Sequence, residues 1–135
     1  MLPIIISSVV GFISFIALDY LWIGVLTKSF YLKELSSHLA LKDGVLAPYL
    51  PAVPFVYIVA IIGIIMFALP KAHSLPSAFL AGAILGFIMY AFYDITNLSI
   101  FKDYSLAVTL VDIAWGTFLV GAVTTIMFFV KGLVA

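Results

Sequence analysis

The sequence predicts an all-α polytopic membrane protein, a bundle of four transmembrane helices with a short amphipathic interfacial helix between spans one and two. Of its 135 residues, 66% are hydrophobic and 9% are charged, against roughly 45–50% apolar and about 25% charged in an average soluble protein. So little polar surface excludes a soluble globular domain and a disordered chain. Six lysines balance six acids, which leaves no basic face for nucleic acid. The absence of cysteine excludes disulfides, thiolate catalysis and cysteine metal sites.

Four mostly apolar runs have the length of about 20 residues that a membrane-spanning helix needs. They cover residues 3–26, 51–69, 77–97 and 106–130. Helices are expected because lipid cannot satisfy an open strand backbone, and the runs lack the alternation of barrel strands. The first run has no preceding basic residues and no small-x-small cleavage site, so it is interpreted as a span and not as a signal peptide. We therefore expect one integral membrane domain over residues 1–135.

Four spans place both termini and the turn 70–76 on one face of the membrane, here called the terminal side. The loops 27–50 and 98–105 lie on the opposite face, the loop side, which carries four of the six lysines and is therefore expected in the cytoplasm. In the long loop, Tyr31, Leu35 and Leu39 recur at helical spacing and predict the interfacial helix, which Asp43-Gly44 would end. This helix is either an anchor or a lid over a site.

Three acids lie inside the predicted spans. At 1.5 Å rise per residue, Asp19 and Asp94 lie about 24 Å from the terminal side, and Asp112 lies roughly 9 Å below the loop side. Three helices thus contribute carboxyl groups to one layer. A carboxylate costs about 2.5–3.5 kcal/mol at the centre of a membrane helix, and no span interior contains a lysine to offset that cost. The acids are therefore protonated, hydrogen-bonded to polar neighbours, or bound to a cation from outside the chain.

Aromatic and polar residues accompany these acids. The spacing Asp-x-x-Trp occurs in the first and fourth spans, and an indole beside a carboxylate is consistent with a cation pocket, although Trp and Tyr also form interfacial belts. Asp94 and Asn97 share one helix face. We predict a substrate- or ion-binding site that contains Asp19, Trp22, Tyr93, Asp94, Asn97, Asp112 and Trp115. Protonated carboxyls that only bridge helices are the structural alternative. No metal, haem or nucleotide motif is present, and the cofactor, if the protein uses one, is unknown from the sequence.

Small residues predict close helix packing. Gly82 and Gly86 form a small-xxx-small face on the third span, and Gly116 can serve likewise on the fourth. The pattern Gly-Phe-Ile-x-aromatic-x-x-x-Asp begins at Gly11 and again at Gly86. This similarity favours a parallel repeat of a two-helix unit, which would place Asp19 and Asp94 at matching depths.

Several motifs resemble a family of small bacterial inner-membrane proteins catalogued as a domain of unknown function. They are Tyr-Asp-Ile-Thr-Asn-Leu from Tyr93, Lys-Asp-Tyr from Lys102, Thr-x-x-Asp-x-x-Trp-Gly from Thr109, Asp-x-x-Trp from Asp19, and Phe30-Tyr31. The resemblance covers nearly the whole chain. It differs at Tyr104, where the family pattern has Trp, and at Ile95, where it has Leu. The family implies a four-helix bacterial membrane protein and brings no activity with it.

Three functions remain open. The first is a proton- or cation-linked transporter of a small polar or cationic solute, for which four helices enclose little volume and a homodimer would help. The second is a lipid-modifying enzyme or lipid-binding subunit, with the acids near headgroup depth and one of them as general acid or base. The third is a non-catalytic membrane partner whose acids pair with basic residues of another protein. The expected partners are the bilayer and a small cation or lipid, but no nucleic acid, and the expected location is the bacterial inner membrane.

Overall fold

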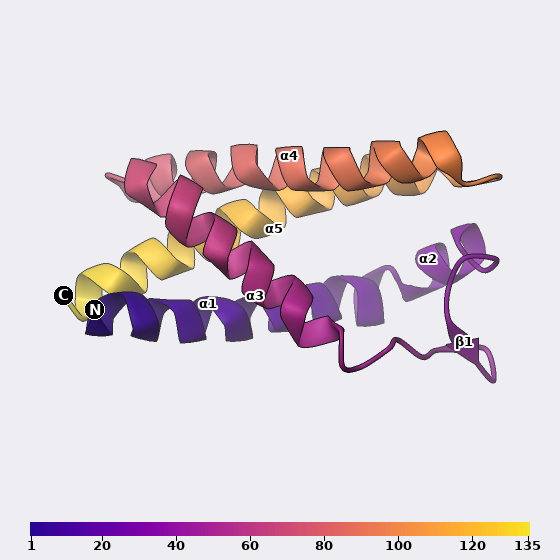
Figure 1. Ribbon diagram of the computed structural model, residues 1–135, viewed down its shortest axis with the longest axis horizontal. Coiled ribbons are helices and arrows are strands. Elements are labelled where there is room, and N and C mark those ends of the chain that lie inside the picture. The colour runs from indigo at the N-terminus through magenta and orange to yellow at the C-terminus, as the bar shows by residue number, and fades with distance from the viewer.

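The computed structural model describes residues 1–135 and contains four helices long and apolar enough to cross a membrane. The first is α1 (Leu2–Asp19), continued by a π-helix (Tyr20–Leu26), and the second is α3 (Val53–Gly63), continued by a π-helix (Ile64–Ala68) and a 3₁₀ turn (Leu69–Lys71). The others are α4 (Leu75–Ile100) and α5 (Leu106–Leu133). The predicted fold class, an all-α four-helix membrane bundle, is confirmed. Both termini lie at one end, and α2 (Lys28–Glu34) lies at the other (Figure 1).

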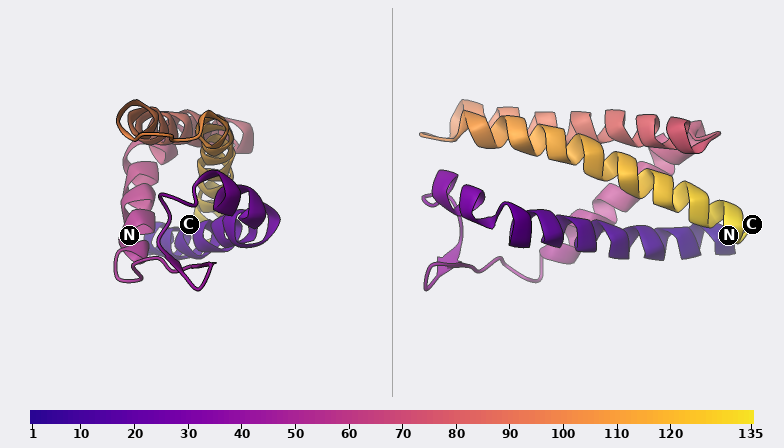
Figure 2. Two further views of the ribbon diagram at one scale, coloured as in Figure 1. Left: turned by 90° about the vertical axis from the view of Figure 1, so that its right-hand side faces the viewer. Right: turned by 180° about the vertical axis from the view of Figure 1, so that it is seen from behind.

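Helix α5 is the centre of the bundle. It packs along α4 and also against α1, crossing from α1 near the termini to α4 at the loop side (Figure 2). The main core joins the first, second and fourth spans through fully or almost fully buried side chains, among them Phe15, Ile64, Leu119, Val123 and Met127. This arrangement makes α5 the helix against which the other spans are positioned.

Glycines allow α4 to approach α5 closely. A Cβ atom on Gly82 would lie 2.6 Å from the backbone oxygen of Val120, and one on Gly86 would lie 2.9 Å from the Cβ of Val120. Gly116 lies against the ring of Tyr90. All three glycines singled out in the sequence therefore lie in the α4–α5 interface, where a side chain would not fit.

The pattern Gly-Phe-Ile-x-aromatic-x-x-x-Asp, shared by the first and third spans, does not mark the expected repeat of a two-helix unit. Gly11 faces Met127 of α5, and Gly86 faces Gly116 of the same helix. However, α4 and α5 pack extensively, whereas α1 and α3 meet only at a short crossing (Figure 1). The pattern marks the stripe by which two helices contact α5, and the two helix pairs are not packed as copies of one unit.

The interfacial helix is shorter than predicted. It ends at Glu34, and Asp43-Gly44 does not terminate it but forms the turn between β1 (Leu41–Lys42) and β2 (Val45–Leu46). The reason is that Asp43 and Gly44 have φ angles of 53° and 75°, which suit the turn of a tight hairpin.

Helix α2 docks against the start of α5. Tyr31 and Leu35 are buried with Val108 in a small second core. The hydroxyl of Ser105, the residue that caps α5, donates a hydrogen bond to Glu34 Oε2 at 2.7 Å. These contacts bring α2 over the loop-side end of α5, next to the turn that carries Asp112.

Candidate functional site

Three carboxyl groups from three helices, Asp19 on α1, Asp94 on α4 and Asp112 on α5, form what we call the carboxyl layer. Asp94 is fully buried, while Asp19 and Asp112 are partly buried. Each one is bound by at least one aromatic side chain from another element or from a loop. The layer lies towards the loop side of the bundle, where α2 packs.

Asp19 connects three of the four spans. The indole Nε1 of Trp115, on α5, donates to Asp19 Oδ1 at 3.1 Å. The hydroxyl of Tyr57, on α3, donates to Asp19 Oδ2 at 3.0 Å. Both carboxyl oxygens thus have donors, and hydrogen bonds to an ionised acceptor are about twice as strong as neutral ones. Asp19 is also the last α-helical residue before the π-helical segment of the first span, a local geometry that is frequent at functional sites.

Asp112 is bound by the loop-side helix. The hydroxyl of Tyr31, on α2, donates to Asp112 Oδ1. In turn, Trp22 Nε1 donates to the Tyr31 hydroxyl oxygen at 3.4 Å. Burial in the first place, and then the neighbouring Asp112 carboxylate, raise the pKa of Tyr31 well above its ordinary value. Tyr31 is therefore a neutral hydrogen-bond donor at physiological pH.

The two tryptophans join these two acids. The rings of Trp22 and Trp115 stack with centroids 4.5 Å apart and planes 6° from parallel. The stack leaves no room for a cation between the indoles. Since the Nε1 of Trp22 binds Tyr31 and that of Trp115 binds Asp19, both N–H groups are used inside the bundle. The tryptophans therefore position the carboxyl layer.

Asp94 is the least satisfied of the three acids. The hydroxyl of Tyr104 donates to Asp94 Oδ1 at 3.1 Å, but Asp94 Oδ2 is buried and has no hydrogen-bond partner. The neighbouring acid is Asp112, whose carboxyl lies near enough to that of Asp94 for the two groups to influence each other. Burial, followed by the charge of Asp94, raises the pKa of Tyr104 to about 12. A buried polar atom left without a partner costs about 1–3 kcal/mol, so Asp94 Oδ2 calls for a proton or another positive group.

The charge of the layer is uncompensated by the chain itself. The donors to the three acids are two phenols near the loop side, a phenol on α3 and an indole, all of them neutral. Two like charges 4 Å apart repel by about 4 kcal/mol at an effective dielectric constant of 20. No group of three His, Cys, Asp or Glu side chains is arranged to hold a metal ion. The chemistry of the carboxyl layer suits the binding of protons or of a cation of low charge.

The seven predicted site residues do not all come together. Asp19, Trp22, Asp94, Asp112 and Trp115 share the network described above, and Asn97 is buried one turn from Asp94, beside Tyr104. Tyr93, however, is 61% exposed on the outer face of α4. Consecutive helix residues point in directions about 100° apart, so the burial of Asp94 turns its neighbour outward.

Sequence reasoning missed three tyrosines of the network, namely Tyr31, Tyr57 and Tyr104. The sequence predicts Tyr31 on the apolar face of a loop helix, a position that gives its hydroxyl no role. Tyr57 is the only residue of α3 that could donate a side-chain hydrogen bond, and that isolated polar group was the available signal. No spacing in the sequence links any of them to the acids.

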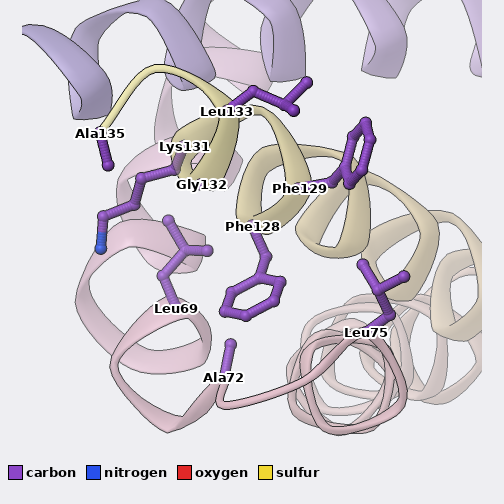
Figure 3. Close-up of a pocket in the computed structure, with 9 residues that line it drawn as sticks. All are labelled: Leu69, Ala72, Leu75, Phe128, Phe129, Lys131, Gly132, Leu133 and Ala135. Carbon is purple, nitrogen blue, oxygen red and sulfur yellow. The ribbon is translucent and has the colours of Figure 1, made fainter.

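The bundle also has an apolar pocket, of about 450 Å³, at the terminal side. It lies between the end of α5 and the α3–α4 turn, with Phe128, Leu69 and Leu75 around it and Lys131 at its edge (Figure 3). It contains no acid, so it is separate from the carboxyl layer.

No curated protein and no solved structure matches this chain. The description "Predicted membrane protein (DUF2177)" belongs to a family that matches residues 4–129. This match includes the first, third and fourth spans with all three acids of the layer. The chain therefore belongs to this family of predicted membrane proteins of unknown function.

Proposed function

We propose that this protein is a small proton- or cation-linked transporter of the bacterial inner membrane, with the carboxyl layer as its ion-binding site. One observation carries the proposal. Three carboxyl groups from three helices lie in one network of contacts, and every side chain that donates to them is neutral. Ionisable residues inside a membrane are costly, and they mark ion pathways and proton relays. A proton or cation from outside the chain is the charge that this layer lacks.

The contacts around the acids also reach the loop side of the bundle. Tyr57 and Trp115 bind Asp19, Trp115 stacks on Trp22, and Trp22 binds Tyr31, which donates to Asp112. Tyr31 on α2 covers Asp112 from that side. Movement of α2 would therefore change access to the layer, which supports the lid interpretation of this helix.

Flux into proteoliposomes tests the proposal. Vesicles that contain a pH-sensitive dye are given gradients of Na⁺, methylammonium or choline, and internal pH is recorded with and without an imposed potential. We expect flux that depends on the protein and is lost in Asp19→Asn and Asp112→Asn. The matched control is Asp103→Asn, which changes an exposed acid of the loop and should retain the flux. Absence of flux would refute transport, and flux that is unchanged in both site variants would refute the carboxyl layer as the ion-binding site.

The lipid-enzyme alternative has one observation in its favour, the position of α2 over an acid near the membrane surface. It predicts a changed lipid composition in membranes that overexpress the wild type and an unchanged one with Asp112→Asn. A non-catalytic partner protein predicts neither flux nor lipid change. We also propose a homodimer as the transport unit because four helices enclose little volume, and the mass of the purified protein in detergent tests this.

A further inference from the structure

We infer that Asp94 and Asp112 together form a binding site for a single exchangeable proton, carried on Asp94 Oδ2 and accepted by the carboxylate of Asp112. Two features of Asp94 point to this site. Asp94 is fully buried, and its Oδ2 has no donor. The group beside it is another carboxyl, which can only accept a hydrogen bond when ionised. A proton between the two oxygens satisfies both at once.

The hydrogen bonds around the pair assign the proton to one side. Asp112 Oδ1 already receives the hydroxyl of Tyr31, which stabilises that carboxyl as an anion. Asp94 receives the hydroxyl of Tyr104 on Oδ1 alone. Its second oxygen is the one acceptor of the pair that is both buried and unpartnered. The protonated form is therefore Asp94 as donor and Asp112 as acceptor.

The titratable groups that face this pair are few. From α1, the charge of Asp19 acts on Asp112; from α2, Tyr31 contacts Asp112; and from the loop before α5, Tyr104 contacts Asp94. Tyr90 on α4 lies near enough to Asp112 to feel its charge. His38, in the loop after α2, packs its ring against Tyr104 with centroids 5.7 Å apart and so lies one residue away from the pair. None of the groups in contact with the two carboxyls is a cation.

Uptake and release of the proton need no other reactant than water. A proton from water on the loop side binds Asp94 Oδ2 and converts a pair with two negative charges into a pair with one. Release returns the proton to water and restores the repulsion between two ionised carboxyls, which a low-dielectric site strongly disfavours. The role of this proton as the coupling ion of a transporter rests on the proposed function. Binding of the proton to the pair can be measured at equilibrium, without any flux.

The decisive variant is Asp94→Asn. The amide of the new side chain can donate to Asp112 as protonated Asp94 does, so the variant resembles the protonated state but cannot titrate. In the wild type, the melting temperature in detergent should fall by several degrees as rising pH removes the proton, because the folded state then holds two adjacent charges. In Asp94→Asn this fall should disappear, and in Asp103→Asn it should persist. If the melting temperature of Asp94→Asn falls with rising pH as that of the wild type does, the inference is overturned.

Infrared spectroscopy detects the protonated carboxyl group directly. Wild type and Asp103→Asn should show one carboxylic-acid carbonyl band that is sensitive to D₂O and vanishes over the same pH interval as the melting change. Asp94→Asn should lack this band. If that variant does not fold, Asp112→Asn is informative, since its amide donates to Asp94, lets it ionise and also removes the band. Persistence of the band in the folded variant overturns the site.

The two proposals fail separately. A titrating pair without flux refutes the transporter and leaves the proton site. Flux with a band that Asp94→Asn does not change refutes the proton site and leaves the transporter.

Discussion

Replacement of Gly82 by alanine tests the central packing of the bundle. The added Cβ would lie 2.6 Å from the Val120 backbone oxygen and 2.7 Å from the Thr124 Cβ. Neither atom is the end of a flexible side chain, so neither can move away alone. To restore an ordinary contact of about 3.5 Å, α4 and α5 would have to separate locally by roughly 0.8–0.9 Å.

The cost follows from this displacement. Overpacking of a close-packed site costs about 1–3 kcal/mol, while the higher helix propensity of alanine returns about 1 kcal/mol. Gly63→Ala is the matched control, because its Cβ would meet only Leu85 Cδ2, at an ordinary 3.7 Å. The gain in propensity is common to both variants and cancels between them. Gly82→Ala should therefore be less stable than Gly63→Ala by about 1–3 kcal/mol.

Reversible unfolding in mixed detergent measures this difference directly. Both variants are titrated under identical conditions, with helicity as the signal and the wild type as reference. We expect Gly63→Ala at or above wild-type stability and Gly82→Ala below it. Equal stability of the two variants would show that α4 and α5 do not approach as closely as described, and would remove the reason given for the glycine face.

Three further outcomes are expected. Tyr31→Phe should lower the unfolding free energy by about 1–3 kcal/mol, because Asp112 loses its donor; Tyr49→Phe, which changes an exposed tyrosine, should not, and equal effects in detergent unfolding would contradict the contact. Trp115→Phe should abolish the coupled indole bands in near-ultraviolet circular dichroism, since the stacked pair is lost; retained bands would exclude the stack. The phenol of Tyr104 should ionise near its pKa of about 12, above the ordinary 10.0. The folded protein holds this proton more tightly than the unfolded chain, so its stabilising contribution is complete below pH 10 and disappears as pH rises through about 12. An ultraviolet titration of wild type against Tyr104→Phe should isolate this ionisation, and identical curves would contradict it.

Hydropathy was sufficient for the four spans, and helical rise was sufficient for the prediction that three acids from three helices lie near one another. Both are local quantities, since a run of apolar residues partitions into lipid whatever it packs against, and depth grows by a constant step per residue. For this reason the four spans and the common layer of Asp19, Asp94 and Asp112 could be predicted. The glycine face of α4 was also predictable, because residues four apart share one side of a helix.

Contacts between elements depended on the tertiary structure. The four-residue spacing from Gly82 and Gly86 predicts that Asp94 faces inward, whereas the exposed position of Tyr93, which the sequence placed in the site, follows from the rotation of the helix about its axis. The loop folds back so that Tyr31, 81 positions before Asp112 in the chain, becomes its donor. Such pairings are set by packing against α5, which no local pattern encodes. Hydrogen-bond partners for buried acids therefore emerge only when the helices assemble.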